Sequence, residues 1–288
     1  MSRAVAPNAK SLILDLLSTL RGGTMPVSAL VQAGDLFGIA ENSVRVALAR
    51  LVTAGQVDRD ERGRYRLGAQ SAPIDRLVTS WRRLGERLRS WDDDWIGVHS
   101  AGLPGRPAER TLRRRERALR FLGFRELAPG LAIRPDNLRG GAAAARAELQ
   151  SLGLEAGALV FELRALDPAT DARARGLWDV AGLCAGYRQS LAELAASEQH
   201  LQIVTEAEGM VESFLLGGRV IRQLVLDPLL PEPIVPVAER DALVAALRRY
   251  DRLGRACWTA FLERHGVLGG RTPADTRIPD GASRLAAR

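Results

Sequence analysis

Hydrophobic positions recur every three or four residues in three stretches near the N-terminus, which predicts three short helices. The first runs from Ser11 to Leu20, and the second opens at Thr24-Met25-Pro26 and ends at Gly38. The third follows Ile39 and ends at Gly55. It carries one apolar stripe, made of Val44, Ala47, Leu48, Leu51 and Val52. This spacing places one face of the third helix in a core and leaves the opposite face to solvent.

A pair of alternating segments follows the third helix. Residues 56–59 and 64–67 flank Asp60-Glu61-Arg62-Gly63, which is a turn sequence. Alternation on both sides of such a turn is typical of a β-hairpin. Three short helices followed by a hairpin predict a winged helix-turn-helix, the fold of many DNA-binding proteins.

The middle of the chain alternates between strand-like and helix-like segments. Strands are predicted at 95–99, 124–127, 131–133 and 158–166, and helices at 107–122 and 142–152. The order βαββαβ predicts a ferredoxin-like arrangement, an antiparallel sheet with two helices on one face. Beyond residue 171 the pattern is helical, with helices predicted at 177–198, 206–226 and 238–263.

These elements predict an α+β chain of several parts. The expected units are a winged helix-turn-helix at 10–70, a linker helix at 71–90, a ferredoxin-like domain at 91–168, a helical domain at 171–266 and a disordered tail at 267–288. At 288 residues the chain is long enough for two or three domains. The tail is assigned from its Gly-, Pro- and Arg-rich composition.

Charge is unevenly distributed along the chain. The net charge is +7, and residues 1–90 carry 14 basic against 8 acidic side chains, whereas residues 151–288 carry 16 against 18. The 40 arginines against one lysine suggest a GC-rich genome, but such a bias does not explain why the excess is N-terminal. A positive field around the predicted winged helix indicates a nucleic-acid partner.

The outer face of the third helix supplies the candidate base-reading residues. They are Asn42, Ser43, Arg45, Val46, Ala49 and Arg50. Arginine bridges two acceptors on guanine and asparagine pairs with adenine, so Arg45 is the residue most suited to reading a base. Ala40 stands where a polar N-cap is expected, so we expect capping to shift to Asn42. The alternative is an ordinary solvated helix face.

The predicted hairpin is the candidate wing. Arg62 and Arg64 are its candidate DNA contacts, placed to touch a phosphate backbone. Asp58, Asp60 and Glu61 cancel part of the wing's charge, so a hairpin laced with surface ion pairs is the alternative.

A denser basic run lies on the first helix of the middle domain. It comprises Arg113-Arg114-Arg115-Glu116-Arg117 and Arg120. Nucleic acid, an anionic ligand such as a coenzyme A ester, and a solvated face with i,i+4 pairs remain open for it.

The sequence gives little support for a metal site or for enzymatic activity. Asp92-Asp93-Asp94 suits a charged loop better than a magnesium site, and the three histidines are isolated, so we expect no metal and no enzymatic activity. No phosphate-loop or nucleophile-elbow motif is present. Cys184 and Cys257 lie far apart in the sequence, so a disulfide is not expected. No apolar run reaches the length of a membrane span, and the N-terminus lacks a signal-peptide pattern. We therefore expect a cytoplasmic protein with no membrane contact. Aromatic side chains of the C-terminal helices are expected in the core or in contacts between subunits, with a few lining a pocket: Trp178, Tyr187, Phe214, Tyr250, Trp258 and Phe261.

Taken in order, several stretches resemble the PaaX family of bacterial transcription regulators, whose founding members repress phenylacetate degradation genes. The stretches are the start Ser-Leu-Ile-Leu with residues 38–52, Gly55 and 65–67, then 91–98 and 122–135, then Leu177-Trp178-Asp179-Val180 with Tyr187, and finally Arg222 with 226–231. The resemblance covers about residues 10–265.

The resemblance implies a homodimer that binds an operator in double-stranded DNA and represses a catabolic operon. It also implies a middle domain similar to a small CRISPR adaptation nuclease, and release from DNA by an aryl- or acyl-CoA thioester such as phenylacetyl-CoA. Ser43, Arg45 and Arg50 lie on the family's recognition helix. No ligand-binding residue is carried over, and no cofactor is expected apart from this effector.

Two rival functions remain. One is a metal-dependent nuclease of the ferredoxin-like domain, which requires Asp92–Asp94 to hold magnesium. The other is an interaction scaffold that does not bind DNA.

Overall fold

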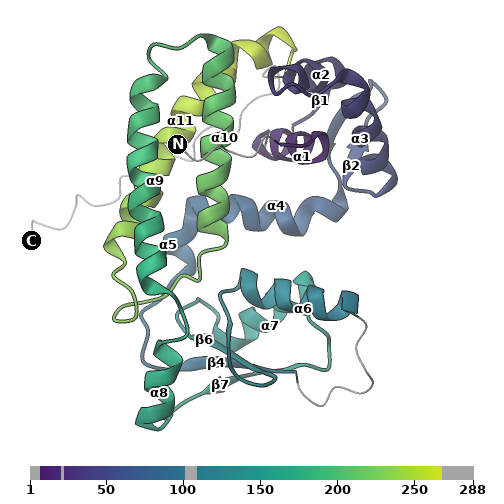
Figure 1. Cartoon of the computed structure of the whole chain (residues 1–288). Coiled ribbons are helices and arrows are strands. Elements are labelled where there is room, and N and C mark those ends of the chain that lie inside the picture. The colour runs from purple at the N-terminus through teal and green to yellow at the C-terminus, as the bar shows by residue number, and fades with distance from the viewer. Residues whose placement is uncertain (1–6, 21–22, 101–108, 268–288) are drawn as a thin grey trace, which may run out of the picture.

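The computed structural model describes residues 7–20, 23–100 and 109–267, and it places an α+β chain of three parts (Figure 1). We call residues 7–71 the N-terminal part and residues 91–163 the middle part. Four C-terminal helices follow them: α8 (Pro168–Arg175), α9 (Val180–His200), α10 (Glu206–Val225) and α11 (Ala238–Arg264). The α+β class agrees with the prediction. The predicted tail lies outside the described residues, apart from Val267.

The N-terminal part contains the three predicted helices and the predicted hairpin. They are α1 (Ala9–Thr19), α2 (Val27–Leu36), α3 (Glu41–Thr53), β2 (Val57–Arg59) and β3 (Arg64–Leu67). Asn8 caps α1 by accepting a hydrogen bond from the backbone N–H of Ser11 (2.9 Å). Gly38 and Gly55 follow α2 and α3 with φ of 69° and 64°, a backbone conformation that favours glycine.

Two details of the N-terminal part differ from the prediction. Met25 and Pro26 do not open a helix but form a short strand, β1 (Met25–Pro26), which pairs with Arg64 and Tyr65 of β3. Proline lacks a backbone N–H, and at this outer strand it fills a place where no donor is needed. The N-cap of α3 is Ala40, with no side-chain cap, so the expected capping by Asn42 was wrong.

The predicted linker helix is broken into four short pieces. They are the 3-10 turn η1 (Ala69–Ser71), α4 (Ala72–Thr79), the 3-10 turn η2 (Ser80–Arg83) and α5 (Leu84–Arg87). Trp81 and Leu84 are buried among side chains of α9, α10 and α11, which bends the chain away from a straight helix. The continuous helix expected over residues 71–90 was therefore wrong, because burying Trp81 and Leu84 outweighed local helix propensity.

The middle part follows the predicted order of elements. It consists of β4 (Trp95–His99), α6 (Glu109–Phe121), β5 (Arg125–Ala128), β6 (Leu131–Pro135), α7 (Gly141–Leu152) and β7 (Leu159–Leu163). The sheet is antiparallel with the order β5-β6-β4-β7. Ile96, Val98 and Val160 belong to the core shared with α6 and α7, whereas Trp95 and Ile133 face the opposite layer with Trp178. Residues 101–108, which include the start predicted for the helix at 107–122, lie outside the described residues.

The C-terminal helices join the other two parts. Helices α9 and α10 both pack against α11, and Met210, Trp258 and Phe261 enter the core of the N-terminal part. Two starts differ from the prediction. Helix α8 is separate, because Asp167 caps it and Pro168 begins it. Helix α9 begins only after Trp178, with Asp179 as its cap.

A buried polar joint fixes the middle part to the C-terminal helices. We use this name for Arg134, Asn137, Tyr187, Asp227 and Arg240, each no more than 5% exposed. Asn137 donates to the carbonyl of Leu229 (2.6 Å), and Arg240 donates to the carbonyl of Leu230 (2.8 Å). The guanidinium of Arg134 donates to the carbonyls of Leu122, Pro135 and Pro228 and to Asn137.

The carboxylate of Asp227 lies at the centre of this joint. It accepts hydrogen bonds from the Tyr187 hydroxyl and from the backbone N–H of Leu229, and Arg240 lies 4.0 Å away. Burial raises the pKa of Tyr187 well above its usual range, so the hydroxyl stays protonated and acts as a donor. Three stretches quoted for the family resemblance thus meet at one structural joint, namely 122–135, Tyr187 and 226–231.

Candidate nucleic-acid interface and interdomain cleft

The outer face of α3 presents the candidate base-reading residues to solvent. Val44, Leu48 and Leu51 are buried and fix the rotation of the helix. All six predicted residues are exposed on the opposite side: Asn42, Ser43, Arg45, Val46, Ala49 and Arg50. The structure therefore brings them together on one face, as the period of the sequence predicts. A helix with this exposure has the form of one that enters a major groove.

Val46 is an exposed apolar residue within that face. Its exposed fraction is 42%, although it lies between polar neighbours. An apolar side chain on a polar helix face gains nothing from water, but it can contact the methyl group of thymine. Val46 is thus suited to a partner surface.

Arg45 is held by its own helix. Its guanidinium forms an ion pair with Glu41 one turn earlier, with Nε–Oε1 and Nη2–Oε1 distances of 2.7 and 2.6 Å. Both side chains are more than half exposed, so the pair is weak. Any anionic or hydrogen-bond-accepting partner of this arginine would have to compete with Glu41.

The two candidate wing residues have different surroundings. Arg62 is exposed at the turn, where Asp60 accepts hydrogen bonds from the backbone N–H groups of Arg62 and Arg64 (3.0 and 2.8 Å). The side chain of Arg64 instead points inward, because it donates to the hydroxyl and carbonyl of Thr24 and to the carbonyl of Gly266. Of the two, Arg62 is the better placed for a phosphate.

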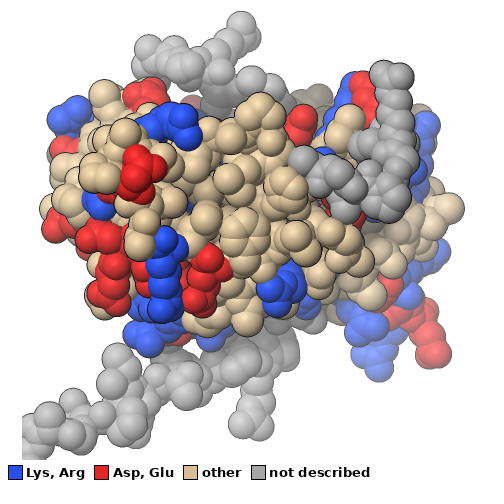
Figure 2. All heavy atoms as spheres, turned by 90° about the horizontal axis from the view of Figure 1, so that it is seen from below, with Lys and Arg blue, Asp and Glu red and all other residues tan. Residues whose placement is uncertain are grey.

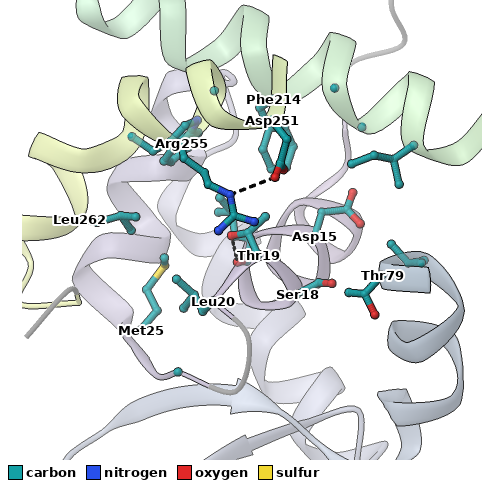
Figure 3. Close-up of a pocket in the computed structure, with 18 of the residues that line it drawn as sticks. Asp15, Ser18, Thr19, Leu20, Met25, Thr79, Phe214, Asp251, Arg255 and Leu262 are labelled. Atoms are coloured by element: carbon teal, nitrogen blue, oxygen red, sulfur yellow. Dashed lines mark hydrogen bonds and ion pairs between the residues drawn. The ribbon is translucent and has the colours of Figure 1, made fainter. Parts of the chain in front are cut away.

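A cleft of about 1490 Å³ opens between the N-terminal part, the linker and the C-terminal helices (Figure 3). Figure 3 shows Asp15, Ser18 and Thr19 of α1 and the following Leu20 on one side, and Phe214, Asp251 and Arg255 of α10 and α11 on the other. The floor is apolar in part, with Leu16, Met25, Phe214, Ile221, Val225, Trp258 and Leu262. Its volume exceeds that of an ordinary small-molecule pocket.

The walls of the cleft are positively charged. Seven arginines and four carboxylates line it, the arginines being Arg62, Arg64, Arg82, Arg117, Arg120, Arg222 and Arg255. Arg82 and Arg255 both bind Asp251, at 2.9 and 3.1 Å. Burial in the wall raises the pKa of Asp15 to about 6, and the nearby Arg222 guanidinium offsets part of this rise. An amphipathic anion fits such a site better than a cation does.

Sequence reasoning found part of this cleft. Phe214, Tyr250 and Trp258, among the aromatic residues considered for a pocket, line it. Trp178, Tyr187 and Phe261 are packed elsewhere. Asp15 and Arg222 were missed as site residues. The sequence does contain a sign of Asp15, because it is the one acidic residue within the apolar run from Leu12 to Leu17.

The acidic triplet does not form a cluster of metal ligands. Asp93 pairs with Arg175 at 2.7 Å, and Asp94 pairs with Arg164 at 3.2 Å. Within residues 7–20, 23–100 and 109–267, no three His, Cys, Asp or Glu side chains are grouped to hold a metal. The geometry therefore offers no support for the nuclease alternative.

The histidines lie apart in the described structure. His200 binds Glu212 (2.6 Å), His265 binds Gln32 (3.0 Å), and His99 is half-buried at the end of β4. No helix among the described residues has the length and apolar character needed to cross a bilayer.

Comparisons with known proteins bear on this interface. Residues 8–71 match the model of a family described as PaaX-like protein, and this family consists mainly of regulators. A solved structure, that of the uncharacterized protein Rv0674 from Mycobacterium tuberculosis, is similar at 28% identity with a TM-score of 0.57. The similarity covers 90% of this chain and 97% of that chain. No curated protein matches the chain. The resemblance to the PaaX family is thereby confirmed, and it rests on residues 8–71, the segment that carries α3 and the wing.

Proposed function

We propose that this protein is a DNA-binding transcriptional regulator that inserts α3 into the major groove of an operator. The observation that carries the proposal is the exposed outer face of α3, with Arg45, Val46 and Arg50 next to a short wing, within the segment that matches the PaaX-like model. Arg45 reads a base and Arg62 touches the backbone. Such a regulator works in the cytoplasm and needs no enzymatic activity.

The regulator acts as a homodimer. Two recognition helices about 34 Å apart, or a multiple of that distance, match successive turns of one face of DNA. Support comes from the middle part, for which we retain the ferredoxin-like interpretation. Leu159 on the edge strand β7 is 61% exposed. Figure 2 looks onto this end of the molecule and shows a broad area free of charged side chains between charged margins. An exposed leucine on an edge strand, at an end of the molecule with a broad uncharged area, suits a contact between subunits.

The regulator is a repressor that an aryl- or acyl-CoA thioester such as phenylacetyl-CoA releases from DNA. The family resemblance implies this effector, and the cleft supports it. The cleft combines an apolar floor with guanidinium groups in its walls. One of these groups, that of Arg222, makes no ion pair within the described residues. Residues of both α1 and α10 line the cleft. A ligand there contacts the part that carries α3 and the helices that hold that part. It shifts DNA affinity to the extent that it binds the DNA-bound and released states unequally.

A mobility-shift experiment with DNA from the protein's own promoter tests the proposal. Arg45→Ala should lose the preference for operator over unrelated DNA, a discrimination worth about 1–3 kcal/mol for a bidentate base contact. Arg173→Ala, an exposed arginine of α8, serves as the control and should bind as the wild type does. Addition of phenylacetyl-CoA should release the wild type from the operator.

Two results would count against the proposal. Operator preference retained by Arg45→Ala would remove α3 as the reading element. An absence of any salt-sensitive DNA binding by the wild type would favour the interaction scaffold.

A further inference from the structure

The outward face of α6 is a stripe of arginines. Arg110, Arg113, Arg114, Arg117 and Arg120 are all exposed. At 100° per residue they fall within an arc of about 120°, and they extend over about 15 Å of helix. The opposite side of α6 is anchored by the buried Ala118 and by Arg115, which pairs with Glu155. This anchoring fixes which face carries the stripe.

The stripe is poorly neutralised within the protein. Arg113 pairs with Glu109. Among the described residues, the guanidinium groups of Arg110, Arg114, Arg117 and Arg120 make no ion pair. The positive charge of Arg120 also helps to lower the pKa of its neighbour Arg125, after the larger effect of burial. Five arginines with one ion pair among them in the described residues repel one another and destabilise a fold, so the stripe suits a partner of opposite charge outside the chain.

One end of the stripe lies in the same cleft as the tip of the wing. Arg117 and Arg120 line the same cleft as Asp60, Glu61 and Arg62 at the tip of the wing. Figure 1 shows α6 on the side of the molecule that carries α3 and the wing, and away from α8. Arg62 of the wing and Arg117 and Arg120 of the stripe therefore line one cleft, which connects the N-terminal part to the middle part.

We propose that this arginine stripe of α6 is a second DNA contact, which binds the phosphates of the duplex that flanks the base pairs read by α3. The inference rests on the proposed function, because α3 sets where the duplex lies. A small anionic ligand explains the stripe less well. Only Arg117 and Arg120 face the cleft, whereas Arg110, Arg113 and Arg114 lie outside it. A duplex carries one negative charge per about 1.7 Å of axis, so it supplies phosphates along the whole stripe.

Salt dependence of binding measures the number of phosphate contacts directly. The test variant is Arg117→Gln with Arg120→Gln, and the matched control is Arg164→Gln with Arg173→Gln, which removes two exposed arginines on or next to α8. Thermal melts and circular dichroism establish that both double variants fold as the wild type does. Affinity is then measured at several salt concentrations for the operator, for unrelated duplex, and for an operator duplex shortened on its flanks.

The stripe variant should lower the slope of log K against log salt by about 0.9 for each phosphate that is no longer neutralised, or about 1.8 in total. Its affinity should fall on the order of tenfold or more at 0.1 M salt, equally for operator and unrelated DNA. Shortening the flanks should weaken the wild type and the control variant more than the stripe variant, because this variant has lost two of the five arginines that bind the flanking phosphates.

The outcomes separate this inference from the proposed function. A stripe variant with the wild-type slope, in a protein whose operator preference depends on Arg45, overturns the α6 contact and leaves the regulator intact. An equal decrease of affinity in the stripe and control variants also overturns it, since the effect is then one of net charge. A wild type without DNA binding overturns the proposed function itself.

Discussion

The Tyr187–Asp227 pair holds the segment after α10, whose carbonyls accept hydrogen bonds from Arg134 and Asn137 of the middle part. The carboxylate is buried, and burial raises the pKa of Asp227 above its usual range. Its hydrogen bonds from Tyr187 and the backbone of Leu229 supply the donors that a buried carboxylate needs. A buried polar group with satisfied partners holds one geometry, whereas the same group without a partner is costly.

Tyr187→Phe should therefore destabilise the protein by about 1–3 kcal/mol, because it leaves one oxygen of the buried carboxylate without a donor. Chemical denaturation followed by circular dichroism measures the change. Tyr65→Phe is the matched control, since the Tyr65 hydroxyl makes no hydrogen bond to the described residues and its removal should change stability little. Equal stability of the Tyr187 variant and the wild type would show that the joint does not depend on this hydroxyl.

At the scale of the element, one ion pair of α3 stabilises the helix and also occupies Arg45, the residue proposed to read a base. Glu41 lies in the first turn, where a carboxylate is favourable, and pairs with Arg45. The same carboxylate is exposed beside Arg45, the residue proposed to read a base, so it would repel the phosphates of a bound duplex. Helix α3 is thus slightly stabilised by a contact that the proposed DNA binding would have to displace.

Glu41→Gln should raise the affinity for DNA by up to about fivefold, because an exposed ion pair of this kind is worth at most about 1 kcal/mol. Fluorescence anisotropy with labelled operator measures the effect, which should shrink at high salt. Glu193→Gln breaks a similar ion pair with Arg219 on α10 and serves as the control. Weaker binding by the Glu41 variant would mean that Glu41 holds Arg45 in its binding position.

At the scale of the whole molecule, α10 and α11 connect the parts. Trp258 and Phe261 enter the N-terminal core, and the neighbouring helix faces line the cleft. The middle part is fixed to the segment between these two helices through Arg134 and Asn137, and it carries the sheet edge that we propose as the contact between subunits. Under the proposed function, a change at the cleft or between two subunits would reach α3 through these packed helices.

Leu159→Arg should weaken the dimer by about tenfold or more, because it places a charge at an exposed apolar position of the proposed contact. Light scattering coupled to size-exclusion chromatography over a range of concentrations measures the change. Ile203→Arg adds the same charge at an apolar residue that is 82% exposed in the turn after α9, and it should leave the dimer intact. A wild type that stays monomeric at all concentrations would contradict the proposed dimer.

The sequence alone determined most of the elements. Val44, Leu48 and Leu51 set the face of α3, and the turn around Gly63 set the wing, because helix period and turn chemistry act between near neighbours. The strand β1 and the break in the linker were not predictable. The first depends on pairing with β3, about forty residues along the chain, and the second on burying Trp81 among distant helices.

The tertiary structure decided which residues meet. Asp15 and Arg222 become neighbours in the cleft, and Arg134 meets Pro228, although more than ninety residues separate each pair. Nothing in local periodicity encodes such contacts, because they depend on how whole helices pack. The direction of Arg64 was decided in the same way, since Thr24 and Gly266 hold a side chain that the hairpin alone would leave at the surface. The sequence thus determined the exposed face of α3, while only the packing of α10 and α11 against the N-terminal part formed the charged cleft.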